Sequence, residues 1–212
     1  MIAYRQAISS KSSASDKLPN VAATESQMLA LGSEAPQFTL PDSGGQQHSL
    51  DGSESVDAYL VMFICNHCPF VKHVATELAR IGNDYGSRKV AIYAINSNDA
   101  HSHPGDNAEA MNQEIANRGY TFPYLIDEDQ TVATSYRASC TPDLYVFDAA
   151  RNLVYRGQLD GSRPSNGVPV TGGDLRAALD AVLAGMAVAE DQIPSIGCSI
   201  KWKPGNEPEW FG

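Results

Sequence analysis

The stretch 63–72, Phe-Ile-Cys-Asn-His-Cys-Pro-Phe-Val-Lys, sets two cysteines between an apolar run and a helical pattern. The apolar run, residues 59–64, has the length of a buried strand. After the cysteines, apolar side chains recur three or four positions apart, at Val71, Val74, Leu78 and Ile81. A Cys-x-x-Cys pair between a strand and a helix is typical of a redox site. We therefore expect Cys65 and Cys68 to act as a dithiol–disulfide pair.

Composition narrows the class of protein. The chain has 212 residues, 42% of them hydrophobic, which suits one domain with extensions. Its formal net charge of -10 argues against a nucleic-acid partner, because phosphate binding needs clustered Lys and Arg. No apolar run approaches the ~18 residues of a membrane span. Four cysteines are too few for a disulfide scaffold in a chain of this length, which favours a chemical role for the pair.

The N-terminal sequence bears on localisation. Residues 1–8 contain no continuous apolar stretch, so we do not expect a secretory signal. The Ser-rich segment 9–15 fits either an organelle transit peptide or a disordered bacterial N-terminus. We expect a cytoplasmic protein.

The sequence predicts one domain with two extensions. We expect an N-terminal extension over residues 1–31, a domain over 32–188 and a tail over 189–212 that packs on the domain. The extension includes a short predicted helix over 25–31.

Apolar patterns predict the elements of the domain. In chain order they are a hairpin of short strands at 32–42 and 46–50, the central strand, the helix after the cysteines ending before Gly86, a buried strand at 90–95, a helix at 106–118, a strand at 122–126, a helix at 128–137 capped by Asp127, a hairpin of 144–147 with 153–156, and a helix over 175–186. This order predicts an α/β protein in which a central mixed sheet is flanked by helices on both faces.

Three motifs carry a resemblance to a known family. They are Gly-x-x-Ala-Pro-x-Phe-x-Leu-x-Asp at 32–42, Cys-Asn-His-Cys at 65–68, and Thr141-Pro142 directly before a predicted strand. Together they resemble the thioredoxin-like superfamily, in particular its redoxin branch of alkyl hydroperoxide reductases and thiol-specific antioxidants. The resemblance spans about residues 32 to 187. It implies a thioredoxin-like fold with a cis bond before Pro142.

The chain also departs from its relatives in this superfamily. A peroxiredoxin carries Thr or Ser three residues before its reactive cysteine and Pro four residues before that, where this chain has Met62 and Ala58. Ile64 replaces the thioredoxin tryptophan, and Tyr59 stands where thioredoxin has a buried Asp. These differences weigh against peroxide chemistry. They also leave the second cysteine without its usual proton acceptor.

The resemblance assigns roles to the site residues. Cys65, at the start of the helix, is expected to be the nucleophile, because the positive end of a helix favours a thiolate. Cys68 would resolve the mixed disulfide, and His67 would make the pair more oxidising than thioredoxin. The Thr141 backbone would pair with an extended substrate strand, with Asn66 and Pro142 also binding substrate.

Other residues leave alternatives open. Cys140 fits a packing role or a place near the site, and Cys198 fits a structural role or a third redox thiol. We expect no organic cofactor and no resident metal. A thiol peroxidase using Cys65 is one alternative function, and a copper chaperone using the cysteine pair with His101 or His103 is another. Expected partners are protein or small-molecule disulfides and thiols, or peroxides, with the protein a monomer or homodimer.

Overall fold

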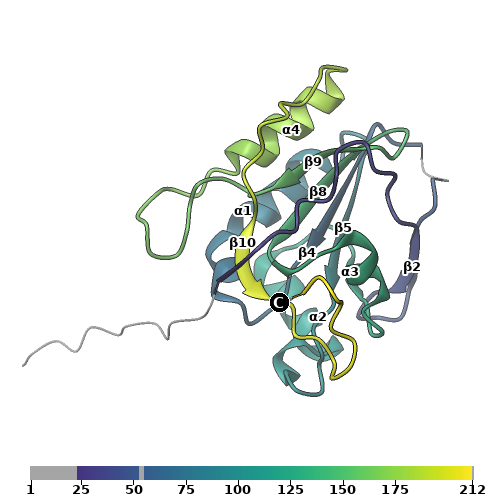
Figure 1. Ribbon diagram of the computed structural model, residues 1–212, viewed down its shortest axis with the longest axis vertical. Helices are drawn as coiled ribbons and strands as arrows, with labels where there is room; N and C mark the ends of the chain where they lie inside the picture. The colour runs from purple at the N-terminus through teal and green to yellow at the C-terminus, as the bar shows by residue number, and fades with distance from the viewer. Residues whose placement is uncertain (1–22, 53–54, 212) are drawn as a thin grey trace, which may run out of the picture.

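A five-stranded mixed sheet forms the centre of the computed structural model, which describes residues 23–52 and 55–211 (Figure 1). Its strand order is β6-β5-β4-β8-β9, in which β4, β5, β6 and β9 run in the same direction and β8 runs antiparallel to its neighbours β4 and β9. The strands are β4 Ala58–Phe63, β5 Val90–Asn96, β6 Tyr124–Ile126, β8 Asp143–Asp148 and β9 Leu153–Gly157. Helix α1, Pro69–Tyr85, joins β4 to β5 and completes the βαβ unit that the sequence predicts.

Helices cover both faces of this sheet, so every residue of β4 is buried. One face packs against α1, α2 (Ala108–Arg118) and α4 (Gly173–Leu183). The other packs against α3 (Thr131–Tyr136) and the hairpin of β2 (Phe38–Pro41) with β3 (Gln47–Leu50). Burial on both sides explains why β4 is a continuous apolar run rather than an alternating one. A single turn of 3-10 helix, η1 (Pro104–Asp106), lies in the loop after β5.

A second, three-stranded sheet brings distant segments together. Its order is β1 (Ala23–Glu25), β10 (Ile196–Ser199) and β7 (Cys140–Thr141), with β10 in the middle. In Figure 1 the yellow strand β10 lies beside the end of the sheet where β4 leads into α1. The tail is therefore a strand of the fold rather than an irregular extension.

Most predicted elements are confirmed, with shifts at their ends. The expected helix over 25–31 is wrong: Glu25 belongs to β1, and Met28 has a φ of 51°, which no right-handed helix accommodates. The last helix, α4, stops at Leu183 instead of 186 because Gly185 adopts a positive φ of 66°. Asp127 caps α3 as expected, by accepting from the backbone amides of Val132 and Ala133.

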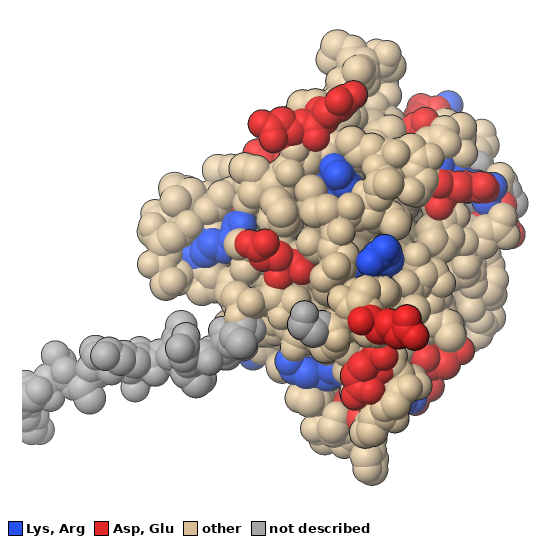
Figure 2. All heavy atoms as spheres, in the orientation of Figure 1, with Lys and Arg blue, Asp and Glu red and all other residues tan. Residues whose placement is uncertain are grey.

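Two predictions are not tested by the described residues. The Ser-rich segment 9–15 lies outside them, and the proposed domain limits stay a prediction. Within the described part of the chain, no helix combines the length and apolarity needed to cross a bilayer. On the face drawn in Figure 2, Lys and Arg lie singly between groups of Asp and Glu, in keeping with the net charge of -10.

Candidate redox site

The cysteine pair lies where β4 ends and α1 begins. Cys68 is the N-cap residue of α1, and Pro69 follows at the first helical position, where a missing N–H leaves no bond unmade. Cys65 and Cys68 are only 1% and 0% exposed, and all four cysteines of the chain are free thiols. Cys65 and Cys68 therefore form a reduced pair that is shielded from solvent.

One side of the pair faces the end of β7. We call Thr141, Pro142, Asp143 and Cys198 the strand side. The Thr141–Pro142 bond is cis, as the resemblance implies. The Cys65 Sγ lies 3.4 Å from the Thr141 Oγ1, and the Cys68 thiol donates to the Thr141 carbonyl oxygen at 3.1 Å. Both sulfurs thus contact the one residue that precedes the cis bond.

Strand β10 occupies the backbone edge of Thr141. Cys198 is paired with Thr141 in antiparallel register. A Cβ added to Gly197 would lie 1.9 Å from the Thr141 carbonyl oxygen, so only glycine allows this approach. The edge expected to receive a substrate strand is therefore filled by the protein's own tail.

The other side of the pair is polar. We call Asn66, His67, His103 and Asp106 the histidine side. The Asp106 carboxylate accepts from the Asn66 backbone amide at 2.8 Å and bonds the His67 Nδ1 at 2.6 Å. Because an ionised carboxylate only accepts, the His67 Nδ1 carries the hydrogen. The His67 ring stacks on His103 with centroids 5.1 Å apart.

Asn66 has a structural position in this arrangement. Its side-chain amide donates to the Gly105 carbonyl at 2.9 Å and accepts from the Tyr124 hydroxyl at 3.1 Å. With both ends of the amide engaged, Asn66 ties the loop between the cysteines to η1 and to the sheet.

Asp106 is a site residue that the sequence analysis missed. It lies 40 positions from Asn66 in a loop without a motif, so only the fold brings it to the cysteines. Burial raises its pKa, but hydrogen bonds from His67 and Asn98 outweigh that effect, and the pKa of Asp106 is lowered. A buried negative charge therefore lies beside the pair.

Cys65 and Cys68 have different electrostatic surroundings. The pKa of Cys65 is raised by its hydrogen bond with Cys68, by burial and by the charge of Asp106. Hydrogen bonds from Cys198 and Cys65 lower the pKa of Cys68, which also lies at the N-terminus of α1. The helix begins at Cys68, one turn after the start expected at Cys65, and the assignment of Cys65 as the nucleophile stays a prediction.

Asp143 is a second carboxyl group that the sequence analysis missed. It follows the cis proline and is fully buried. Burial raises its pKa to about 7. The Tyr145 hydroxyl donates to one of its oxygens at 3.0 Å, and the other has no partner among the described residues.

Comparison with known proteins places this site in a family. The model of the AhpC/TSA family matches residues 31–156, which is more than half of the chain. The chain belongs to the AhpC/TSA family. Membership confirms the predicted redoxin branch, and the cysteine pair lies inside the matched segment.

Three similar proteins refine the picture of this AhpC/TSA chain. A solved structure of an uncharacterized conserved protein from Geobacillus kaustophilus is 55% identical, with a TM-score of 0.85 over 88% of this chain and 99% of that one. The thiol-disulfide oxidoreductase ResA of Geobacillus thermodenitrificans is 29% identical over 127 residues, 59% of this chain and 67% of its own length. The thioredoxin domain of a thiol-disulfide oxidoreductase from Bacteroides vulgatus is 21% identical, with a TM-score of 0.51 over 60% of this chain and 88% of that one. The last likeness confirms the thioredoxin-like fold.

The remaining cysteine and histidines of the AhpC/TSA chain lie in different settings. The buried Cys140 contacts the Pro142 and Ser195 carbonyl oxygens at 3.6 and 3.9 Å, which fits a packing role. His101 is exposed on the loop before η1. His73, on α1, bonds the Ser162 hydroxyl at 2.6 Å.

A metal ion would find a different ligand set from the one considered for copper. The potential ligand atoms of Cys65, His67 and Asp106 lie within 4.8 Å of one another, and neither His101 nor His103 belongs to that group. The Asp106–His67 hydrogen bond already occupies two of the three groups.

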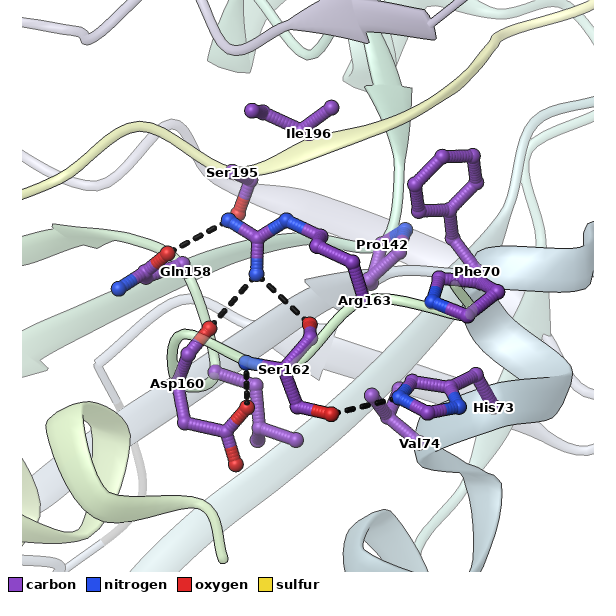
Figure 3. Close-up of a pocket in the computed structure, with 12 residues that line it drawn as sticks. Phe70, His73, Val74, Pro142, Gln158, Asp160, Ser162, Arg163, Ser195 and Ile196 are labelled. Carbon is purple, nitrogen blue, oxygen red and sulfur yellow. Dashed lines mark hydrogen bonds between the residues drawn. The ribbon is translucent and has the colours of Figure 1, made fainter. Parts of the chain in front are cut away.

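A small cavity of about 20 Å³ lies behind the cis proline (Figure 3). That volume suits about one water molecule. Phe70 and His73 of α1 line it on one side, and Arg163 lines it on another. Ser195 and Ile196, at the start of β10, close it. In this AhpC/TSA chain the tail thus covers the cis proline as well as the edge of Thr141.

Proposed function

We propose that this AhpC/TSA protein is a thiol–disulfide oxidoreductase whose exchanging pair is Cys65 and Cys68. The observation that carries the proposal is the convergence of both sulfurs on Thr141, at 3.4 Å and 3.1 Å, beside a cis proline and at the start of a helix. The similarity to ResA, a protein named a thiol-disulfide oxidoreductase, supports it.

Cys65 attacks the substrate disulfide while Cys68 stays a thiol. In the reduced pair the Cys68 thiol donates to the Thr141 carbonyl oxygen at 3.1 Å. As Cys65 attacks, its sulfur bonds one substrate sulfur, and its proton passes to the other substrate sulfur, which leaves as a thiol.

Resolution returns the site to a disulfide. Cys68 loses its proton to the departing substrate sulfur and attacks the Cys65 sulfur of the mixed disulfide. The Cys65–Cys68 bond forms, and the second half of the substrate leaves as a thiol. The reverse sequence oxidises a dithiol substrate with the same atoms, so the geometry serves either direction of electron flow.

Substrates approach from the histidine side. The strand side is closed by β10, whereas the His67 side chain is 33% exposed. His67 places a hydrogen-bonding ring near Cys65, where a positive ring would stabilise the thiolate that forms during attack. The Asp106 carboxylate holds the ring in place.

The peroxidase alternative has no comparable support from the residues near Cys65. The two positions that distinguish the chain from peroxiredoxins, Ala58 and Met62, are fully buried in β4, where they pack in the core. Neither offers a hydroxyl to a peroxide at Cys65.

The test is turnover of a disulfide. We expect the wild-type protein to catalyse insulin reduction by dithiothreitol, or oxidation of reduced ribonuclease, and Cys65→Ser to lose that activity entirely. Cys140→Ser is the matched control, because it removes a buried thiol that contacts carbonyl oxygens only, and it should keep the activity.

Two results would reject the proposal. One is the absence of turnover of any protein or small-molecule disulfide by the folded wild type. The other is rapid peroxide consumption through Cys65 without disulfide exchange, which would establish the peroxidase alternative.

A further inference from the structure

The tail delivers a third thiol to the cysteine pair. Cys198, on β10, is buried and is paired with Thr141, the residue that both Cys65 and Cys68 contact. Side-chain hydrogen bonds with both Cys198 and Cys65 act on Cys68. The Cys68 sulfur therefore has two thiol neighbours.

The position of Cys198 is fixed on both sides along the chain. Before it, Gly197 packs directly against the Thr141 carbonyl. After it, the Ile200 amide donates to the Ser139 carbonyl at 3.0 Å and the Lys201 amide donates to the Asn98 side chain at 2.8 Å. Ile200 itself is buried in the core. These contacts hold the thiol in register with the pair instead of leaving it on a loose tail.

Cys140 provides an internal contrast. It lies in the same small sheet, directly opposite Ser199, and is equally buried. Its sulfur contacts the Pro142 and Ser195 carbonyl oxygens. Burial in this sheet does not by itself bring a thiol to Cys68; the register of Cys198 does.

We propose that Cys198 is a third redox thiol that attacks Cys68 in the Cys65–Cys68 disulfide and forms a Cys68–Cys198 disulfide. The inference rests on the proposed function, which produces the Cys65–Cys68 disulfide from a substrate disulfide. In this step the Cys68–Cys198 bond forms and the Cys65–Cys68 bond breaks, and the proton of Cys198 passes to the departing Cys65 sulfur. No electrons enter or leave, so the step needs no further oxidant.

The exchange stores the disulfide under β10. Cys65 returns to the thiol form on the side that substrates reach, while the oxidised bond lies between two buried sulfurs. Because the reverse attack by Cys65 regenerates the first disulfide, external thiols reach the stored bond through Cys65. The pKa of Cys198, raised by its hydrogen bond to Cys68 and by burial, keeps this sulfur protonated until it reacts.

Peptide mapping tests the proposal directly. Trypsin cuts after Lys17, Lys72, Arg176 and Lys201, so Cys65 and Cys68 share the peptide 18–72 and Cys198 lies in 177–201. The reduced wild type is oxidised with oxidised glutathione, quenched in acid, alkylated and digested. We expect mass spectrometry to find the two peptides linked. Only a bond to Cys198 can link them in this way.

Variants identify the sulfurs. Cys65→Ser retains three thiols and should lose two of them on oxidation, with the linked peptide becoming the main product. Cys198→Ser and Cys198→Ala should lose the link and keep the Cys65–Cys68 disulfide. Cys140→Ser should retain the link at the wild-type level.

Several outcomes would overturn the inference. They are an unlinked wild type that still turns over disulfides, a Cys65→Ser variant that keeps all three thiols, or one that carries glutathione on Cys68 instead of the link. If the link forms but no substrate is turned over, the thiol pair stands and the proposed function fails. The two proposals are thus rejected by different measurements.

Discussion

Two buried carboxyl groups, Asp106 on the histidine side and Asp143 on the strand side, respond to burial in opposite ways. Their exposed fractions are nearly equal, at 3% and 0%. The pKa of Asp106 is lowered, whereas burial raises that of Asp143 to about 7. Burial alone therefore does not decide the charge around the cysteines.

The balance between burial and hydrogen bonding explains the difference. Asp106 bonds a backbone amide, the His67 ring and the Asn98 side chain, and these bonds outweigh its burial. Hydrogen bonds from Ser26 and Tyr145 also lower the pKa of Asp143, but burial outweighs them. At neutral pH Asp106 thus carries a full negative charge and Asp143 a partial one. The Asp106 charge opposes a thiolate on Cys65.

The largest expected effect on stability comes from a substitution that displaces β10 from the strand side. In Gly197→Ala, the new Cβ would meet the Thr141 carbonyl at 1.9 Å, so β10 must leave β7. We expect the free energy of unfolding to fall by more than about 4 kcal/mol, the range of severe overpacking. Denaturant titration measures that loss. Alkylation of Cys198 in the native protein should become faster in parallel.

Gly161→Ala is the matched control for this substitution. An added Cβ there has no heavy atom within 4 Å, and the free energy of unfolding should change by less than about 1 kcal/mol. If Gly197→Ala kept wild-type stability and a protected Cys198, close packing of β10 on Thr141 would be refuted.

Asp143→Asn should remove the pH dependence that Asp143 contributes to stability. The folded pKa of about 7 exceeds the reference value of 3.8, so the folded state binds the proton more tightly. This contribution to stability is present below that reference and is lost as pH rises to about 7, a loss of at most about 4 kcal/mol. Relative to wild type, the variant should therefore be more stable near pH 8 than near pH 5. Urea titrations of both proteins at the two pH values measure this difference in the free energy of unfolding. If the variant differed from wild type by the same amount at both pH values, Asp143 would not titrate in this range.

Local pattern was enough to predict much of this molecule. The apolar run of β4, the cysteine pair and the Thr141–Pro142 motif lie within short windows, where strand length, helix period and turn chemistry act. The βαβ unit and the second hairpin follow from them, and the resemblance to the redoxin branch added the cis bond. The same windows placed the helix start one turn too early, at Cys65 instead of Cys68.

Contacts between distant residues could not be predicted in this way. Asp106 reaches the site because β5 ends beside β4, and its neighbours His-Pro-Gly form no motif. The pairing of Cys198 with Thr141 depends on backbone register in a four-residue strand, and a shift by one residue would turn its sulfur to the other face. Gly197 specifies that register, but a single glycine in a tail has no meaning until its neighbour is known.

Asp106→Asn should produce a smaller effect than Asp143→Asn, with the opposite dependence on pH. The lowered pKa of Asp106 means that its ionised form stabilises the fold above the reference value of 3.8, and that this stability is lost as pH falls through the folded pKa. At neutral pH we expect the variant to lose about 1–3 kcal/mol, the range for a buried hydrogen bond to a charged group. The loss should shrink in acid, where wild-type Asp106 is also protonated.

Asp106→Asn also tests whether the Asp106 charge acts on Cys65. Because the Asp106 charge raises the pKa of Cys65, its removal should lower that pKa and move the thiolate absorbance to lower pH. Asp99→Asn is the control: Asp99 lies on the same loop and bonds Ser102 and the His101 amide instead of the cysteine loop, so the Cys65 titration should stay unchanged. A Cys65 titration that is identical in wild type and Asp106→Asn would show that burial and Cys68, without Asp106, keep this sulfur protonated.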